Sequence, residues 1–90
     1  ISNADQVQNS SFKLRPQPAS DWVELEFEHS VNDANCYVYN MLGVCCSAQK
    51  ANGINLKINL IDKNFSDGNY LVQVIDKNGT SSSQLLSIVK

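Results

Sequence analysis

The sequence predicts an all-β domain, an immunoglobulin-like antiparallel β-sandwich of about seven strands. Three observations lead to this fold class. Short runs rich in β-branched and aromatic residues recur along the chain, and several of them alternate apolar and polar residues. Turn signals separate these runs about every 8–12 residues, and no run has the spacing of an amphipathic helix. The Cys…Trp…Cys spacing of true immunoglobulin domains is absent, so the likeness is one of architecture.

Length and charge narrow the possible functions. Ninety residues make one small domain, and an apolar share of 42% is enough for one core. Seven basic and nine acidic side chains give a net charge of −2, which argues against a nucleic-acid surface. No apolar run reaches the ~18 residues of a membrane-spanning helix. Because no basic segment precedes an apolar one, we expect no signal peptide within this chain, and an export address would lie upstream.

The chain divides into a short lead and a folded domain. Residues 1–11 are polar and aperiodic, which is typical of a linker or disordered lead, and residues 12–90 are expected to form the sandwich. The expected strands are Phe12–Arg15, Trp22–Glu28, Cys36–Tyr39, Val44–Gln49, Ile54–Leu60, Tyr70–Ile75 and Gln84–Lys90.

The strongest local signal is the reversal from Asn40 to Gly43. An Asn side chain can accept a hydrogen bond from the backbone two residues on, and Gly adopts a positive φ without a Cβ clash. The flanking strands are therefore expected to pair as an antiparallel hairpin. Its two simplest registers place Cys36 opposite Ser47 or Ala48.

The first strand is expected to stop at Pro16-Gln17-Pro18, because proline removes backbone donors at a sheet edge. In the next strand the acidic residues Glu24, Glu26 and Glu28 share a face, which we interpret as solvated rather than catalytic. The side chains expected to face the core from the second, third and sixth strands are Val23, Leu25, Phe27, Ala34, Cys36, Val38, Tyr70, Val72 and Val74.

Three polar segments are predicted to be turns or loops. Residues 29–35 and 49–53 are rich in turn-forming residues, and residues 62–68 resemble a calcium loop whose glycine and final acidic ligand are misplaced. In the last of these, Phe65 is expected to point inward. The strand between them alternates cleanly, so we expect all four of its apolar side chains to face the core: Ile54, Leu56, Ile58 and Leu60.

The end of the chain carries a second hairpin signal. Asn78-Gly79 is the strongest short turn motif, and it precedes the final run of residues 84–90. That run alternates weakly, so its inward face stays open.

The cysteines do not form an obvious site. Cys45 and Cys46 are neighbours on a strand and point to opposite faces, and no Cys lies opposite Cys36, so no disulfide is expected. The single histidine, His29, lies in a polar stretch, and nothing completes a metal site, so we expect no cofactor. Nucleophile, base and orienting group do not converge, and we expect no enzyme.

Four motifs follow one another in the sequence. They are Pro16-Gln17-Pro18-Ala19, the run Val38-Tyr39-Asn40-Met41-Leu42-Gly43, the run Phe65-Ser66-Asp67-Gly68-Asn69-Tyr70, and the closing Ile88-Val89-Lys90. This order resembles the type A C-terminal sorting domain of proteins exported by the type IX (Por) secretion system of Bacteroidetes-type bacteria. The likeness covers about residues 12–90. Its matching motif positions are Pro16, Pro18, Asn40, Gly43, Gly68 and Tyr70.

Two positions depart from the family pattern. Gln17 replaces the Asn that the family has between its prolines, and Gln84 stands where the family often has a Lys at the start of its final strand.

The resemblance implies a secretion signal that directs an N-terminal cargo protein across the outer membrane. The implied partners are outer-membrane components of the secretion machinery, a surface sorting protease and the cargo. The implied route passes through the periplasm to the cell surface or the medium. Proteolysis would remove the domain at the preceding linker, near Gln8, Asn9, Ser10 and Ser11, because proteases need extended backbone.

The final strand would be the recognition element, since an exposed edge strand can recruit a partner through its unpaired backbone groups. Its residues are Leu85, Leu86, Ser87, Ile88, Val89 and Lys90. The alternative is an adhesion or carbohydrate-binding module, in which the outward-facing Trp22, Tyr37 and Tyr39 would stack on sugars.

Overall fold

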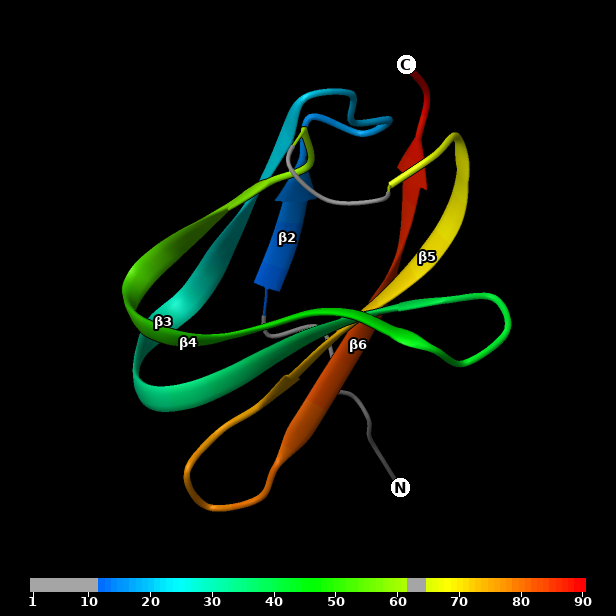
Figure 1. The fold of residues 1–90 in the computed structure, drawn as a ribbon. Helices are drawn as coiled ribbons and strands as arrows, with labels where there is room; N and C mark the ends of the chain where they lie inside the picture. Colours follow the sequence, from blue (N-terminus) through cyan, green and yellow to red (C-terminus); the bar gives the residue numbers. More distant parts are fainter. Residues whose placement is uncertain (1–11, 62–64) are drawn as a thin grey trace, which may run out of the picture.

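The computed structural model describes residues 12–61 and 65–90 (Figure 1). The expected lead, residues 1–11, lies outside the described residues. The strands are β2 (Phe12–Arg15), β3 (Trp22–Asn40), β4 (Cys45–Asn59), β5 (Gly68–Ile75) and β6 (Ser81–Ile88). They form one antiparallel five-stranded sheet in the order β2-β3-β5-β6, and β4 pairs with the other side of β3.

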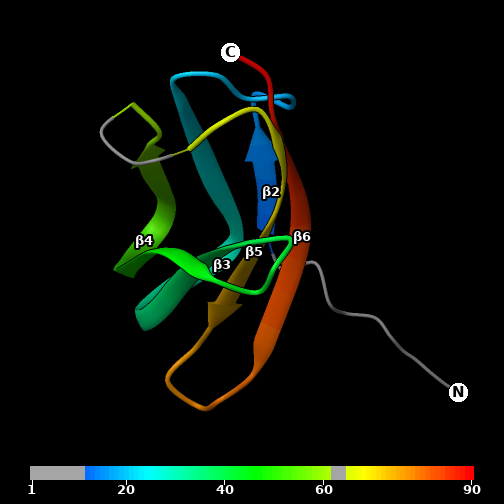
Figure 2. The same ribbon diagram turned by 45° about the vertical axis from the view of Figure 1, so that its right-hand side comes forward.

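The sheet curls over itself because β3 is long and bent (Figure 2). Its first part pairs with β2, where Phe12 faces Phe27, and with the end of β4, where Trp22 faces Asn59. Its second part pairs with β5 and with the start of β4. Register irregularities around Val31 lie between these parts. One hydrogen-bonded sheet therefore supplies both layers of the sandwich.

The all-β, sandwich-like fold class is confirmed, but residues 12–61 and 65–90 form five strands where seven were expected. The second and third expected strands are one strand, β3, and the fourth and fifth are one strand, β4. Residues 29–35 and 49–53 were predicted to be turns, and this is wrong. Bulges replace the turns there: Gly53 has a φ of 94° opposite Val31, and the Asn52 side chain accepts a hydrogen bond from the Asp33 N–H at 2.8 Å.

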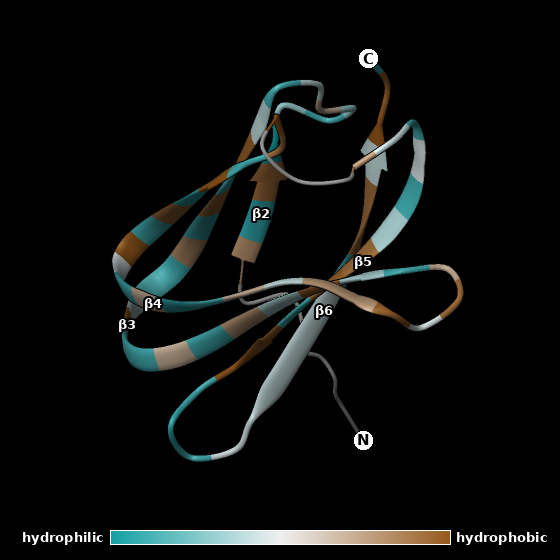
Figure 3. Cartoon of the chain, viewed as in Figure 1, coloured by the Kyte–Doolittle hydropathy of each residue, from teal (hydrophilic) through white to brown (hydrophobic). Residues whose placement is uncertain are grey.

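A single hydrophobic cluster fills the space between the two layers. Every inward position predicted for the second, third and sixth expected strands is buried, and so is Phe65. Figure 3 shows the result as alternating hydrophobic and hydrophilic bands along β2 and β3. The sequence did not decide which face of the final strand points inward. In β6, Leu86 and Ile88 are buried, whereas Leu85 is 63% exposed.

One part of the predicted core is wrong. Ile58 and Leu60 are buried, but Ile54 is 59% exposed and Leu56 is only partly buried. Ile54 directly follows Gly53, where the β3–β4 ribbon bends, and the core does not cover its side chain there. Strict alternation predicts burial only as far as the ribbon covers the core.

The hairpin at Asn40–Gly43 is confirmed. The Asn40 Oδ1 accepts hydrogen bonds from the backbone N–H groups of Leu42 (2.9 Å) and Val44 (3.0 Å), and Gly43 has a φ of 86°. The register differs from both predicted ones, because Cys36 faces Gln49. Next to the turn, the Asn40 N–H donates to the Val44 carbonyl. An irregularity between Val38 and Tyr39 then shifts the register of β4 by one residue.

The hairpin at residues 76–80 repeats this construction. The Asp76 Oδ1 accepts hydrogen bonds from the N–H groups of Asn78 and Thr80, both at 2.9 Å, and Gly79 has a φ of 89°. The predicted hairpin is therefore confirmed, but the side chain that shapes it is Asp76 rather than Asn78.

Replacing Asn40 by Ala should lower the free energy of unfolding by about 1 kcal/mol, because two turn N–H groups lose their acceptor. Chemical denaturation monitored by tryptophan fluorescence measures this loss. Asn32→Ala, on an exposed part of β3, is the matched control and should change the free energy by less than about 0.5 kcal/mol. Equal losses in the two variants would contradict the assigned role of Asn40.

Candidate functional site

The candidate site is β6 together with the segment that follows β2. The register pairs Asn40 with Tyr70 and Gly68 with Ile88, and Ala19 forms an isolated parallel bridge to Ile88. Motifs that are far apart in the sequence therefore adjoin at one end of the sheet. The sequence alone did not reveal this convergence, because register across β5 and β6 depends on tertiary pairing.

The outer edge of β6 is paired with the segment after the prolines. The Ala19 N–H donates to the Ser87 carbonyl, and the Val89 N–H donates to the Ala19 carbonyl, both at 2.8 Å. Ala19 is completely buried. The peptide bonds before Pro16 and Pro18 are both cis, and both prolines are exposed after the end of β2, as the sequence predicted for a strand terminator.

The Gln17 side chain continues this pairing. Its Nε2 donates to the Leu85 carbonyl at 3.0 Å, and its Oε1 accepts a hydrogen bond from the Ser87 N–H at 2.9 Å. From β6, the Gln84 Nε2 donates to the carbonyl of Phe12 in β2. Gln17 and Gln84 are the two departures from the family pattern, and both lie where β2 and β6 come together.

Lys90 is held by two further contacts. Its backbone N–H donates to the Asp67 carboxylate at 2.9 Å, and its ammonium donates to the Leu60 carbonyl at 3.0 Å. The Leu60 N–H in turn donates to the Asp21 carbonyl at 2.9 Å. The chain beyond β6 is thus tied to both ends of the connection between β4 and β5.

The motif at residues 65–70 is a packed turn. The rings of Phe65 and Tyr70 meet edge to face, with centroids 5.4 Å apart. The Tyr70 hydroxyl accepts a hydrogen bond from the Ser66 N–H (3.0 Å) and donates one to the Ser66 carbonyl (2.9 Å). Gly68 has a φ of 147°, which favours a residue without a Cβ. The family-motif residues therefore shape turns and strand ends.

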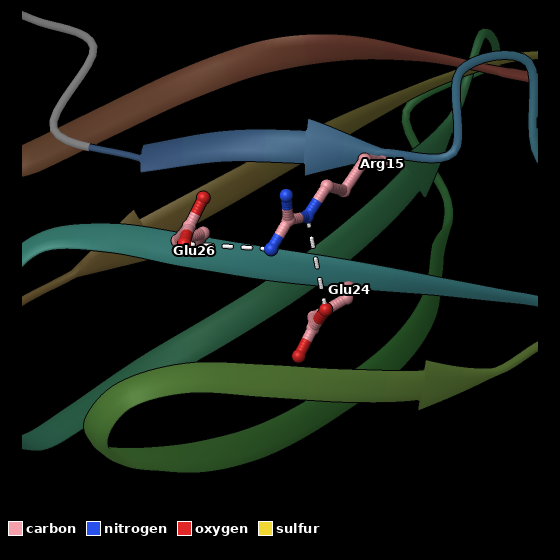
Figure 4. A network of polar contacts seen from close by, with 3 residues as sticks. All are labelled: Arg15, Glu24 and Glu26. Atoms are coloured by element: carbon pink, nitrogen blue, oxygen red, sulfur yellow. Dashed lines mark ion pairs between the residues drawn. The ribbon is translucent and has the colours of Figure 1, made fainter.

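The acidic face of β3 carries ion pairs at its surface (Figure 4). The Arg15 guanidinium lies 3.8 Å from the Glu24 carboxylate and 3.4 Å from that of Glu26. Arg15 is exposed, so these pairs contribute little to stability. Among residues 12–61 and 65–90, no three His, Cys, Asp or Glu side chains gather as a metal site would require.

The outward aromatic rings do not share one platform. Trp22 lies in the first part of β3, where the Lys57 ammonium is 4.6 Å from its ring centroid. Tyr37 and Tyr39 lie in the second part, half-buried and tilted by 36° to one another. Stacking on a flat sugar face needs coplanar, exposed rings, which this arrangement does not provide.

The three cysteines are free thiols in different surroundings. Cys36 is buried in the core, and burial raises the pKa of its thiol from 9.0 to about 12. Cys45 is exposed and Cys46 is partly buried. These positions agree with the prediction that no disulfide joins them.

A profile of the family described as "Secretion system C-terminal sorting domain" matches residues 13–89. The chain belongs to this family. It is a C-terminal sorting signal for type IX secretion, which favours that interpretation over the adhesion or carbohydrate-binding alternative. A sorting domain acts on an attached cargo and interacts with the type IX secretion machinery, and its signal leads to the cell surface or to secretion.

The fold of the sorting domain also occurs elsewhere. The crystal structure of CopC from Methylosinus trichosporium OB3b superposes with a TM-score of 0.50 and 18% sequence identity, over 91% of this chain and 87% of CopC. At this identity the similarity shows the fold alone. No curated protein matches the chain significantly. In the part of the sorting domain that the structure describes, no helix is long and apolar enough to cross a membrane.

At pH 8 a maleimide reagent should label Cys45 of the folded sorting domain and leave Cys36 unmodified, because the buried thiol stays protonated. Mass spectrometry after digestion identifies the labelled sites, and labelling in denaturant is the control in which Cys36 must react.

The same raised pKa of Cys36 means that the free energy of unfolding falls as the pH rises from about 9 towards 12, since only the unfolded thiol ionises there. Rapid labelling of Cys36 in the folded domain would contradict the assignment.

Proposed function

We propose that outer-membrane components of the type IX machinery recognise the folded sorting domain through the outward side chains of β6. One observation carries this proposal. Leu86 and Ile88 complete the core, whereas Leu85 on the same strand is 63% exposed, and Val89, directly after the strand, is 57% exposed. Apolar side chains displayed to solvent in this way favour contact with a partner protein. They take up this arrangement only when β6 has paired with β5. A partner that binds them therefore distinguishes a folded sorting domain from an unfolded one.

The route follows from where that partner is. The cargo first reaches the periplasm, the folded domain then meets the outer-membrane components, and the cargo arrives at the cell surface or in the medium. We further propose that the domain has no catalytic activity and binds no nucleic acid. Membership of a family of sorting signals and the net charge of −2 support these two statements.

A surface protease removes the domain ahead of β2 in this proposal. The expected cleavage region, Gln8 to Ser11, lies outside the described residues. Phe12, which follows it, is buried and pairs with Phe27. A protease needs extended, accessible backbone, so paired and buried backbone from Phe12 onward supports a cut before that residue.

Mass spectrometry of cargo released by a secreting cell should find a new carboxyl terminus between residues 8 and 11. Fusions of residues 1–90 to a reporter enzyme provide the material. A strain lacking the sorting protease is the control, and its exported fusion should keep the whole domain. A cut after Phe12 would contradict the proposed boundary.

Trimming residues 85–90 does not test recognition cleanly, because it also removes the buried side chains of Leu86 and Ile88. Surface substitutions do test it. Leu85→Lys and Val89→Lys should each lower export of a reporter fusion by about tenfold or more, as expected for the loss of an interface anchor. Ile54→Lys is the matched control, since Ile54 is 59% exposed and lies away from β6, and its export should stay within about twofold of the parent.

Thermal unfolding of each variant separates recognition from folding. All three substitutions are at exposed positions and should leave the melting temperature nearly unchanged. Normal export of both Leu85→Lys and Val89→Lys would exclude this face of β6 as the recognition surface.

A further inference from the structure

We infer that the Gln17 side chain acts as a substitute peptide unit that closes the backbone edge of β6, so that the secretion machinery binds the strand by its side chains and not by adding a strand to its edge. This inference rests on the recognition through β6 proposed above and specifies how that recognition occurs. Gln17 is here a positioning residue that controls which groups of β6 remain available.

The hydrogen bonds of Gln17 repeat those of a backbone neighbour. In a parallel pairing, one residue donates its N–H to a carbonyl and accepts from the N–H two residues further along. Ala19 does this with the Ser87 carbonyl and the Val89 N–H. Gln17 does the same with the Leu85 carbonyl and the Ser87 N–H, but uses its side-chain amide. A primary amide offers the same donor and acceptor as a peptide unit, so the side chain extends the pairing begun by Ala19.

A side-chain amide is needed because β2 and β6 do not form a backbone ladder with one another. Their pairing partners in the described part of the chain are β3 and β5, respectively. The two strands nevertheless lie side by side in both ribbon views (Figures 1 and 2), and the Gln84 amide reaches the Phe12 carbonyl across the gap. Gln17 and Gln84 thus join two strand edges that would otherwise expose unpaired backbone groups.

The closed edge restricts how a partner can bind. Strand addition needs free N–H and C=O groups along one edge. From Leu85 to Val89, four such groups already take part in hydrogen bonds with Gln17 and Ala19. A partner strand that paired with this part of the edge would have to displace these hydrogen bonds, which offsets the bonds it would gain. The exposed side chains of Leu85 and Val89 remain accessible without that displacement.

Amide hydrogen exchange of the 90-residue chain, measured by NMR, tests the closed edge independently of export. Gln17→Met keeps the length of the side chain but removes its amide, and exchange of the Ser87 N–H should accelerate by about tenfold. The Val89 N–H, which donates to the Ala19 carbonyl, is the internal reference and should change much less. Gln49→Met, on β4, is the matched control.

Gln17→Glu keeps the test decisive even if the Met variant folds poorly. Its carboxylate still accepts from the Ser87 N–H, but it cannot donate to the Leu85 carbonyl, so protection of Ser87 should be retained. Native exchange of Ser87 in a folded Gln17→Met chain, or the same acceleration in Gln49→Met, would overturn the role of Gln17.

The sign of the change in export distinguishes the two modes of binding. If the machinery uses side chains, Gln17→Met should be exported no better than the parent, whereas Leu85→Lys should lose about tenfold. If it adds a strand, opening the edge should raise export several-fold and Leu85→Lys should matter little, and this result would overturn the inference. If the parent fusion is not exported at all, the proposed function is contradicted. The role of Gln17 is then still tested, because the exchange measurements do not depend on export.

Discussion

The bend in β3 is the constraint on which the rest of the structure depends. One strand supplies hydrogen-bonding edges to β2, β4 and β5, so the position of its bulges decides where the sheet folds over itself. The two layers are therefore not independent sheets joined by loops. Once β3 bends, the inward side chains of both layers meet in one core, and β2, which pairs with the first part of β3, is brought beside β6.

The seam between β2 and β6 then requires a different kind of closure. Backbone ladders join β2 to β3, β3 to β4, β3 to β5 and β5 to β6. Between β2 and β6, side-chain amides and the backbone of Ala19 make the contacts. The ties of Lys90 to Asp67 and Leu60 complete the same end. The end of β6 therefore stays in place only while the segment after the prolines and the connection between β4 and β5 are folded against it.

Local patterns predicted much of this arrangement. Strand positions, the inward faces of β3 and β5, and both hairpins follow from alternation and turn chemistry, which act over a few residues. The predicted turns at residues 29–35 and 49–53 failed because bulges accommodate the same polar residues without ending a strand. Gln17 and Gln84 appeared in the sequence only as departures from a family pattern, since their partners are separated from them by about seventy residues.

The sequence by itself determined the fold class, the family and hence the sorting function, because these depend on ordered motifs and on a period of two. The tertiary structure alone decided how many strands there are, which side chains of β6 face solvent, and which backbone edges are closed. Those features arise from pairings between distant residues, whose register no local pattern specifies. The difference matters most for β6. The sequence suggested an open edge there, but Gln17 and Ala19 occupy the edge from Leu85 onward, and the side chains of Leu85 and the following Val89 are exposed instead.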